Sequence, residues 1–153
     1  MEKSLLFLYN GRQTVNEAFQ ILDHTADIGI IAYGADLKEL FSNAALALFN
    51  VITDLETIQE KSHLDLEVCS EDRDSLLVDW LNELICCFDS KHVLFGRCDI
   101  ETLTDNALKA TCYGEDFDPN RHEIKTGVKA ATYHMLRVDT DDNGYRAQII
   151  LDI

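Results

Sequence analysis

The sequence predicts an α+β fold, in which a largely antiparallel sheet packs against two amphipathic helices. Apolar residues recur every three or four positions in two segments, 37–52 and 76–88, as they do on the buried side of a helix. Most other segments alternate apolar and polar residues, which is typical of half-buried strands, and short turn sequences join them. We therefore expect one compact domain over residues 19–153. Residues 1–18 are expected to form an N-terminal extension, to which the sequence assigns no role.

The strands are expected to lie in hairpins toward the C-terminus. In chain order, strands are predicted at 19–22, 28–33, 63–69, 93–103, 107–117, 128–138 and 145–153. The connections contain turn residues, among them Asp118-Pro119-Asn120 and Asn143-Gly144. Both helices precede this region. Asp36 followed by Glu39 forms a capping-box pattern for the first helix, and Ser70, followed by two acids, is expected to cap the second.

The charge balance restricts the class of partner. Twenty-eight acidic residues against 13 basic ones give a formal charge of −15. Such a surface repels phosphate backbones, so general nucleic-acid binding is not expected, whereas basic proteins and divalent cations are natural counterparts. No apolar run is long enough to span a membrane, and a cytoplasmic protein is expected.

The five cysteines predict neither a disulfide framework nor a zinc site. They are odd in number, contain no C-x-x-C pair, and four of them fall in patterns typical of a core. We expect them to act as small apolar residues in a reducing compartment. Trp80, in the apolar stripe of the second helix, is likewise expected to be a core residue and not a binding aromatic.

Carboxylates gather near both ends of the domain. The polar stretch 23–27 contains two of them beside His24, and the last strand ends with Asp152 and the terminal carboxylate of Ile153. Ionised groups beside a sheet are costly unless a positive group meets them, although a solvated turn capped by Asp also explains 23–27. Alternation along the last strand places Asp152 on the face opposite the Ile153 side chain.

A basic segment interrupts this acidic chain. Four basic residues lie within 17 positions, together with two histidines: Arg121, His122, Lys125, Lys129, His134 and Arg137. The segment either neutralises neighbouring acids or binds an acidic ligand, a phosphate or a partner's carboxylates, and composition favours neither. The acidic run that begins at Asp139 is not a calcium-binding EF-hand loop, because its twelfth position is Ile150 and not Glu.

Four motifs in register resemble one protein family, archease, over residues 19–153. They are Asp23-His24-Thr25-Ala26-Asp27, the helix with Trp80-Leu81-Asn82-Glu83, the stretch from Lys125 to His134, and the terminal Leu151-Asp152-Ile153. Gly127 departs from the family pattern, which often has Glu at that position.

The resemblance implies an accessory protein and not an enzyme. Archeases assist the GTP-dependent RNA ligase that joins 2′,3′-cyclic-phosphate or 3′-phosphate ends to 5′-hydroxyl ends in tRNA splicing and RNA repair, by promoting ligase guanylylation and multiple turnover. Carried over to this sequence, the family's divalent metal, for which calcium is expected, would be bound by Asp27, Asp152 and the carboxylate of Ile153, and Lys129 would act in activation. Oxygen ligands suit calcium, magnesium or manganese better than zinc. Asp23 could join only if the chain turns, since four extended residues span roughly 13 Å.

Two other functions remain as alternatives. A metal-dependent hydrolase or nuclease would use Asp27 and Asp152 as ligands and His24 as base, but the chain lacks a basic track for RNA. A chaperone-like interaction module would need an exposed apolar surface. His24 otherwise serves as a structural hydrogen-bonding group or supports a metal ligand.

Overall fold

The structure is a computed structural model that describes residues 18–23 and 27–153, apart from the side chain of Asp23. Its elements, in chain order, are β1 (Phe19–Asp23), β2 (Asp27–Gly34), α2 (Leu37–Ile52), the 3-10 helix η1 (Leu55–Thr57), β3 (Ser62–Cys69), α3 (Arg73–Lys91), β4 (Val93–Leu103), β5 (Ala107–Asp116), β6 (Ala130–Asp141) and β7 (Gly144–Asp152). The α+β class is confirmed. The predicted extension, except for residue 18, and His24 lie outside the described residues.

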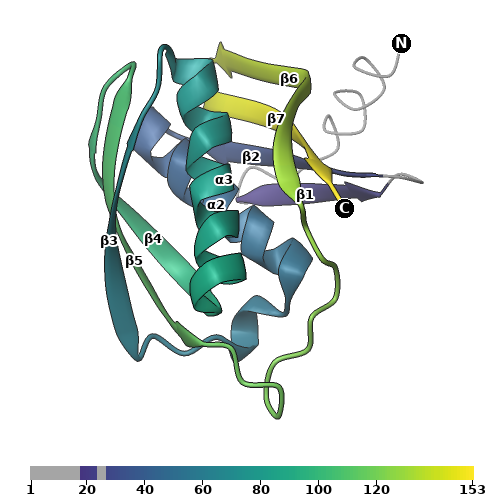
Figure 1. Cartoon of the computed structure of the whole chain (residues 1–153). Coiled ribbons are helices and arrows are strands. Elements are labelled where there is room, and N and C mark those ends of the chain that lie inside the picture. The colour runs from purple at the N-terminus through teal and green to yellow at the C-terminus, as the bar shows by residue number, and fades with distance from the viewer. Residues whose placement is uncertain (1–17, 24–26) are drawn as a thin grey trace.

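The strands form two antiparallel sheets, with the helices between them (Figure 1). One sheet has the order β1-β2-β7-β6 and the other β3-β5-β4. Helix α2 packs against β2 of the first sheet and β4 of the second, and α3 packs against β6 and β3. Ala47 and Val51, outside the apolar stripe expected for α2, are also buried. A helix that is apolar around most of its circumference is covered on two sides, which accounts for the three layers.

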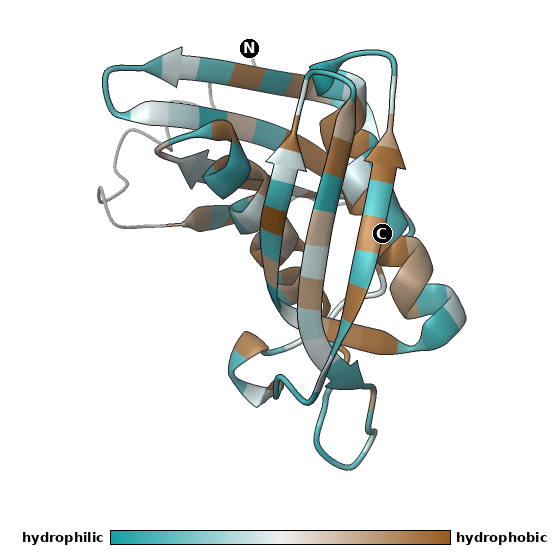
Figure 2. Ribbon diagram, turned by 90° about the vertical axis from the view of Figure 1, so that its left-hand side faces the viewer, coloured by the Kyte–Doolittle hydropathy of each residue, from teal (hydrophilic) through white to brown (hydrophobic). Residues whose placement is uncertain are grey.

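The outer surface of the β3-β5-β4 sheet faces the viewer in Figure 2, where hydrophilic and hydrophobic residues alternate along the strands. In β3, Leu66 and Val68 are buried while Asp65 and Glu67 are exposed. This period of two agrees with the expected half-buried strand. The same alternation places the apolar side chains of this sheet toward the helices.

An aspartate caps the N-terminus of each of the two α-helices. Asp36 accepts a hydrogen bond from the Glu39 N–H at 2.8 Å, as its capping pattern predicts. The prediction that Ser70 caps α3 is wrong, because Asp72 accepts from the Ser75 N–H at 2.8 Å. The Ser70 hydroxyl instead donates to Asp79. A carboxylate one residue before the first turn both accepts this bond and meets the positive end of the helix dipole.

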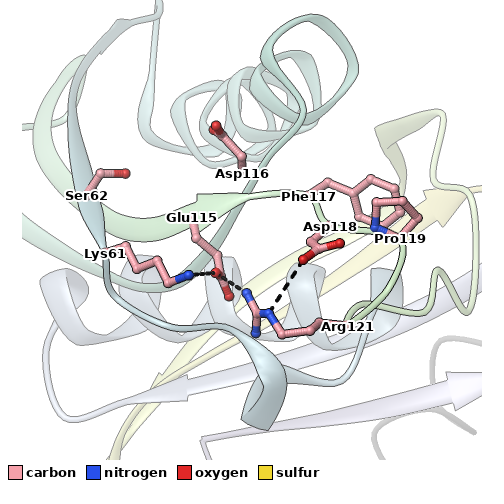
Figure 3. A pocket seen from close by; sticks show the side chains of 8 residues that line it. All are labelled: Lys61, Ser62, Glu115, Asp116, Phe117, Asp118, Pro119 and Arg121. Carbon is pink, nitrogen blue, oxygen red and sulfur yellow. Dashed lines mark hydrogen bonds and ion pairs between the residues drawn. The ribbon is translucent and has the colours of Figure 1, made fainter.

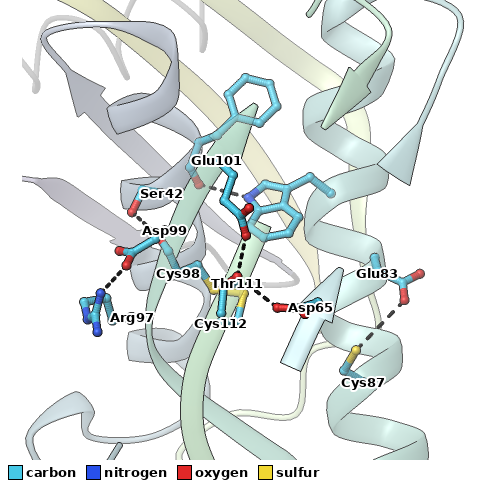
Figure 4. The surroundings of a disulfide bond; sticks show 12 residues. Ser42, Asp65, Glu83, Cys87, Arg97, Cys98, Asp99, Glu101, Thr111 and Cys112 are labelled. Atoms are coloured by element: carbon cyan, nitrogen blue, oxygen red, sulfur yellow. Dashed lines mark hydrogen bonds and ion pairs between the residues drawn. A yellow bond between two sulfur atoms is a disulfide. The ribbon is translucent and has the colours of Figure 1, made fainter. Parts of the chain in front are cut away.

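The expectation of no disulfide is also wrong. Cys98 on β4 lies directly opposite Cys112 on β5, and a disulfide joins them (Figure 4). Both residues are buried, as their pattern indicated, but only the strand register reveals that they are neighbours. Cys69, Cys86 and Cys87 are free. The cysteines therefore no longer argue for a reducing compartment.

Gly114 allows β4 and β5 to approach closely beside an irregularity in their pairing. The register of the two strands shifts between Phe95 and Arg97, opposite this glycine. A Cβ atom added at Gly114 would lie 1.8 Å from the carbonyl oxygen of Leu94, whereas one added at Gly127 would meet nothing within 4 Å.

We expect Gly114→Ala to lower the free energy of unfolding by about 3 kcal/mol or more, because the backbone must move to relieve the overlap. Gly127→Ala is the matched control and should change it by less than about 0.5 kcal/mol. Urea unfolding followed by circular dichroism measures both. Equal stabilities of the two variants would contradict the close approach.

Candidate functional site

Three neighbouring strands of the four-stranded sheet bring residues that are distant in the sequence together at one end of the sheet. Strand β7 pairs with both β2 and β6, and its Asp152 lies directly opposite Asp27 on one side and Ala130 on the other. Just before β6, the Lys129 N–H donates to the Asp152 carbonyl oxygen at 2.7 Å. The register therefore brings Asp27, Asp152, Ile153 and Lys129 to the same corner of the molecule.

The Asp27 and Asp152 side chains share one face of the sheet. Residues directly opposite each other in an antiparallel pair point to the same side, with Cβ atoms about 5 Å apart. Ile149 and Leu151 of β7 belong to the core between the sheets, so Asp152 points to the other face. Asp152 is exposed and Asp27 half-buried. The Ile153 side chain packs against the core, as the alternation along the last strand predicted.

Lys129 is fixed through its backbone and not through its side chain. The Lys129 side chain is exposed, while the neighbouring Val128 is buried. Within residues 18–23 and 27–153, no ion pair involves the Lys129 ammonium group. A lysine held in place by its main chain, with its charge free, is suited to contact another molecule.

The sequence interpretation missed Asn82, which holds the start of β6. The Asn82 side chain on α3 accepts from the Ala131 N–H at 2.8 Å and donates to the Ala131 carbonyl oxygen at 3.1 Å. This amide thus pairs with β6 as another strand would, two residues after Lys129. The sequence does contain a signal for this role. Asn82 is a polar amide next to the apolar stripe of a core helix, and it belongs to one of the four motifs described above.

Among the described residues, no three side chains of His, Cys, Asp or Glu gather in a group that could hold a metal ion. Asp27 and Asp152 supply two carboxylates, so a metal at this corner also requires the carboxylate of Ile153 or main-chain oxygens. Two further groups considered above, His24 and the side chain of Asp23, lie outside the described residues.

A separate pocket of about 390 Å³ lies beside β5. Its lining includes both charged and apolar side chains: Lys61, Ser62, Glu115, Asp116, Phe117, Asp118, Pro119 and Arg121 (Figure 3). The Glu115 carboxylate, only 4% exposed, lies at its centre. It accepts hydrogen bonds from the Gln59 N–H at 2.8 Å and from Arg121, and Lys61 Nζ is 3.5 Å away.

His122 completes this cluster in its neutral form. The Asp118 N–H donates to Nδ1 of His122 at 2.9 Å, so Nδ1 is the acceptor. The proton is therefore on Nε2, which donates to Glu115 at 2.9 Å. Burial by itself raises the pKa of Glu115, but the bonds from Gln59, His122 and Arg121 outweigh it and lower this pKa to about 2. The cluster ties the turn after β5 to the domain.

The basic segment consequently divides into two parts. Arg121 neutralises Glu115, and Arg137 Nε lies 2.9 Å from Asp139. Lys129 has no such role among the described residues, although it belongs to the same run of positive charge. Of the two interpretations of this segment, neutralisation thus applies to the arginines, whereas a ligand or partner contact stays open for Lys129.

Comparison with known proteins identifies the family. Residues 19–153 match the model of the Archease protein family. The protein archease of Sulfolobus acidocaldarius is 43% identical over 136 residues, which are 88% of this chain and 98% of that protein. The chain belongs to the archease family. The archease resemblance drawn from the four motifs is thereby confirmed.

Two solved structures share this fold over most of the chain. The solution structure of Methanobacterium thermoautotrophicum protein 1598 matches with a TM-score of 0.73 at 40% identity, over 89% of this chain and 99% of that one. The crystal structure of a Thermotoga maritima archease, described as a possible chaperone, matches with a TM-score of 0.62 at 24% identity, over 88% and 96%. This second match supports the fold. In the described part of the chain, no helix is long and apolar enough to cross a membrane.

The Glu115 cluster predicts an acid-sensitive term in the stability of this archease. Because the folded-state pKa of Glu115, about 2, lies below its ordinary value of 4.5, the carboxylate stabilises the fold above that value. This contribution, on the order of 3 kcal/mol, should be lost as the pH falls from about 4.5 to 2.

Glu115→Gln should therefore lower the stability at neutral pH and flatten the dependence of the unfolding free energy on pH between 5 and 2. Urea unfolding at several pH values measures this slope. The exposed Asp105→Asn variant, as control, should keep the wild-type slope. Parallel curves for wild type and Glu115→Gln would show that this carboxylate is not preferentially ionised in the folded state.

Proposed function

We propose that this archease is an accessory protein of a GTP-dependent RNA ligase and has no turnover of its own. The partner ligase would join RNA ends with a 2′,3′-cyclic phosphate or 3′-phosphate to 5′-hydroxyl ends, and this protein would promote its guanylylation and repeated turnover. The observation that carries the proposal is the register that unites Asp27, Asp152, Ile153 and Lys129. These are the positions at which the family resemblance implies metal binding and activation.

Asp27, Asp152 and the carboxylate of Ile153 would bind one divalent cation, most plausibly calcium. Two like charges directly opposite each other on one face of a sheet repel, and a cation between them removes the repulsion. A third carboxylate beside Asp152 raises the negative charge of the site. Calcium accepts six to eight oxygen ligands at 2.3–2.6 Å, so water or main-chain oxygens would complete its coordination. The residues present therefore fit a hard cation and not zinc.

Lys129 would contact the ligase. Its side chain is exposed, and its main-chain N–H donates to the Asp152 carbonyl oxygen, so its backbone lies next to the proposed cation site. A compact ammonium binds carboxylate or phosphate oxygens without the fixed geometry that an arginine requires. The bound cation would keep this corner rigid by joining β2 to the end of β7, and thereby hold Lys129 in position.

The hydrolase alternative has less support. The general base that this alternative requires, His24, lies outside the described residues. The formal charge of −15 also opposes productive binding of RNA by this chain alone. An accessory role requires neither a base nor an RNA-binding track.

The cation site should depend on the charge at the end of the sequence. Adding one residue after Ile153 replaces a full carboxylate by a peptide carbonyl, and Asp152→Asn removes another charge. Each change should weaken calcium binding about tenfold or more, which calorimetry measures. Asp142→Asn, in the hairpin before β7, is the control and should bind calcium as the wild type does. Equal affinities of wild type and extended chain would exclude the terminus as a ligand.

Lys129→Ala should abolish stimulation of the ligase and leave the fold intact. Ligation of 3′-phosphate and 5′-hydroxyl RNA under multiple-turnover conditions, with each variant added to the ligase, measures this loss. Lys125→Ala, an exposed lysine of the same segment, should stimulate normally. Normal stimulation by Lys129→Ala would eliminate its role, and joining or cleavage of RNA by the purified protein alone would contradict an accessory function.

A further inference from the structure

The outer face of the β1-β2-β7-β6 sheet carries a second hydrophobic cluster. Leu22, Ile31 and Ile150, on three neighbouring strands, are 8%, 0% and 4% exposed, and the partly buried Tyr33 and Met135 pack against them. This cluster is separate from the core between the sheets. Both helices pack on the opposite face of this sheet, so they do not cover it.

A buried polar group on this face lacks a partner. Gln148 of β7 pairs directly with Ile31 and is 0% exposed. Its Nε2 donates to the Met135 carbonyl oxygen at 2.8 Å, but its Oε1 accepts no hydrogen bond from any described group. A buried acceptor without a donor costs roughly 1–3 kcal/mol. The face thus combines apolar side chains and an acceptor that are nearly fully buried, although neither helix packs on it.

The strand β6 is irregular where it borders this cluster. Its pairing with β7 shifts between Thr132 and Arg137. Met135 lies within this interruption with a positive φ of 54°, in the left-handed region that non-glycine residues seldom adopt. Its side chain packs against the hydrophobic cluster of this face. The irregularity thus adds a partly exposed apolar side chain to the outer face.

We propose that residues 5–9, in the segment before β1, cover this face. They are Leu5-Leu6-Phe7-Leu8-Tyr9, five consecutive apolar residues within an otherwise mostly polar stretch. The Tyr33 N–H donates to the Ala18 carbonyl oxygen at 2.9 Å, so the chain enters β1 next to a member of the cluster. This proposal does not rest on the proposed function.

The length of the segment suits this arrangement. The eight residues 10–17 between the apolar run and Ala18 span at most about 26 Å when extended. The outer face is on the order of 20 Å long, since six residues separate Asp27 from Tyr33 at about 3.3 Å each. The family match begins at residue 19, and the relative from S. acidocaldarius is covered over 98% of its length. The apolar run therefore lies outside the part of the chain that the family match covers.

The rate at which peroxide oxidises Met135 tests the proposal, because a covering segment shields its sulfur. Met135 is distinguished by peptide mass spectrometry from Met1, which is the other methionine of the sequence. Leu6→Asp with Phe7→Asp should increase the oxidation rate several-fold. The matched control, Gln13→Asp with Thr14→Asp, adds the same charge to the same segment at polar positions and should oxidise as the wild type does. Wild-type rates in both double variants would overturn the proposal.

Amide hydrogen exchange of residues 5–9 gives the reciprocal measurement. These amides should be protected in the wild type and lose protection in Met135→Asp, which places a charge on the face at a backbone conformation that Asp tolerates. Unprotected amides in the wild type would contradict the covering segment. Protection of Met135 that rises with protein concentration, with a doubled mass in light scattering, would instead assign the face to a second copy of the chain.

Discussion

The pairing of β7 between β2 and β6 is the constraint on which the rest of the structure depends. Most residues of this strand have a defined neighbour on both sides, and these neighbours are more than 100 positions away on the β2 side. A slip of one residue would move Ile149 and Leu151 out of the core and place Asp152 inside it. The cost of that exchange fixes the register, and the register in turn fixes which functional groups meet.

The two helices of the middle layer fix the position of one sheet relative to the other. Helix α2 contacts both sheets, and the buried Trp80 of α3 donates from Nε1 to the Phe41 carbonyl oxygen at 2.9 Å. That bond satisfies the one polar group of a large apolar side chain and links the two helices. Asn82, two residues further along α3, then holds β6. Helix α3 thus connects the core to β6, the strand that begins next to Lys129.

The fold and the residues of the candidate corner were predictable from the sequence to different degrees. The periods of two and 3.6 give the strands and helices because they reflect burial of one face, which is a local property. Other features depend on which segments become neighbours in space. They are the separation into two sheets, the Cys98–Cys112 disulfide and the hydrogen bonds between Asn82 and Ala131. Pairing between distant segments leaves no local signal. Asp27, Asp152, Ile153 and Lys129 were singled out through motifs of a family, and no periodicity in this chain relates them.

The end of the sequence is held in place by two independent contacts, and this bears on whether its carboxylate can act as a ligand. Chain ends usually fray, and a mobile carboxylate loses conformational entropy when it binds an ion. Here the Ile153 side chain packs against the core, and the preceding residue accepts the Lys129 N–H through its carbonyl oxygen. Both contacts are made within the chain itself, so a cation bound at the proposed site would need little further ordering of the terminus. The second of these contacts also fixes the backbone of Lys129, whose side chain is exposed, beside Asp152. In a chain of formal charge −15, the register therefore brings to one corner two carboxylates, which suit the proposed cation, and a lysine, which suits the proposed acidic contact of a partner.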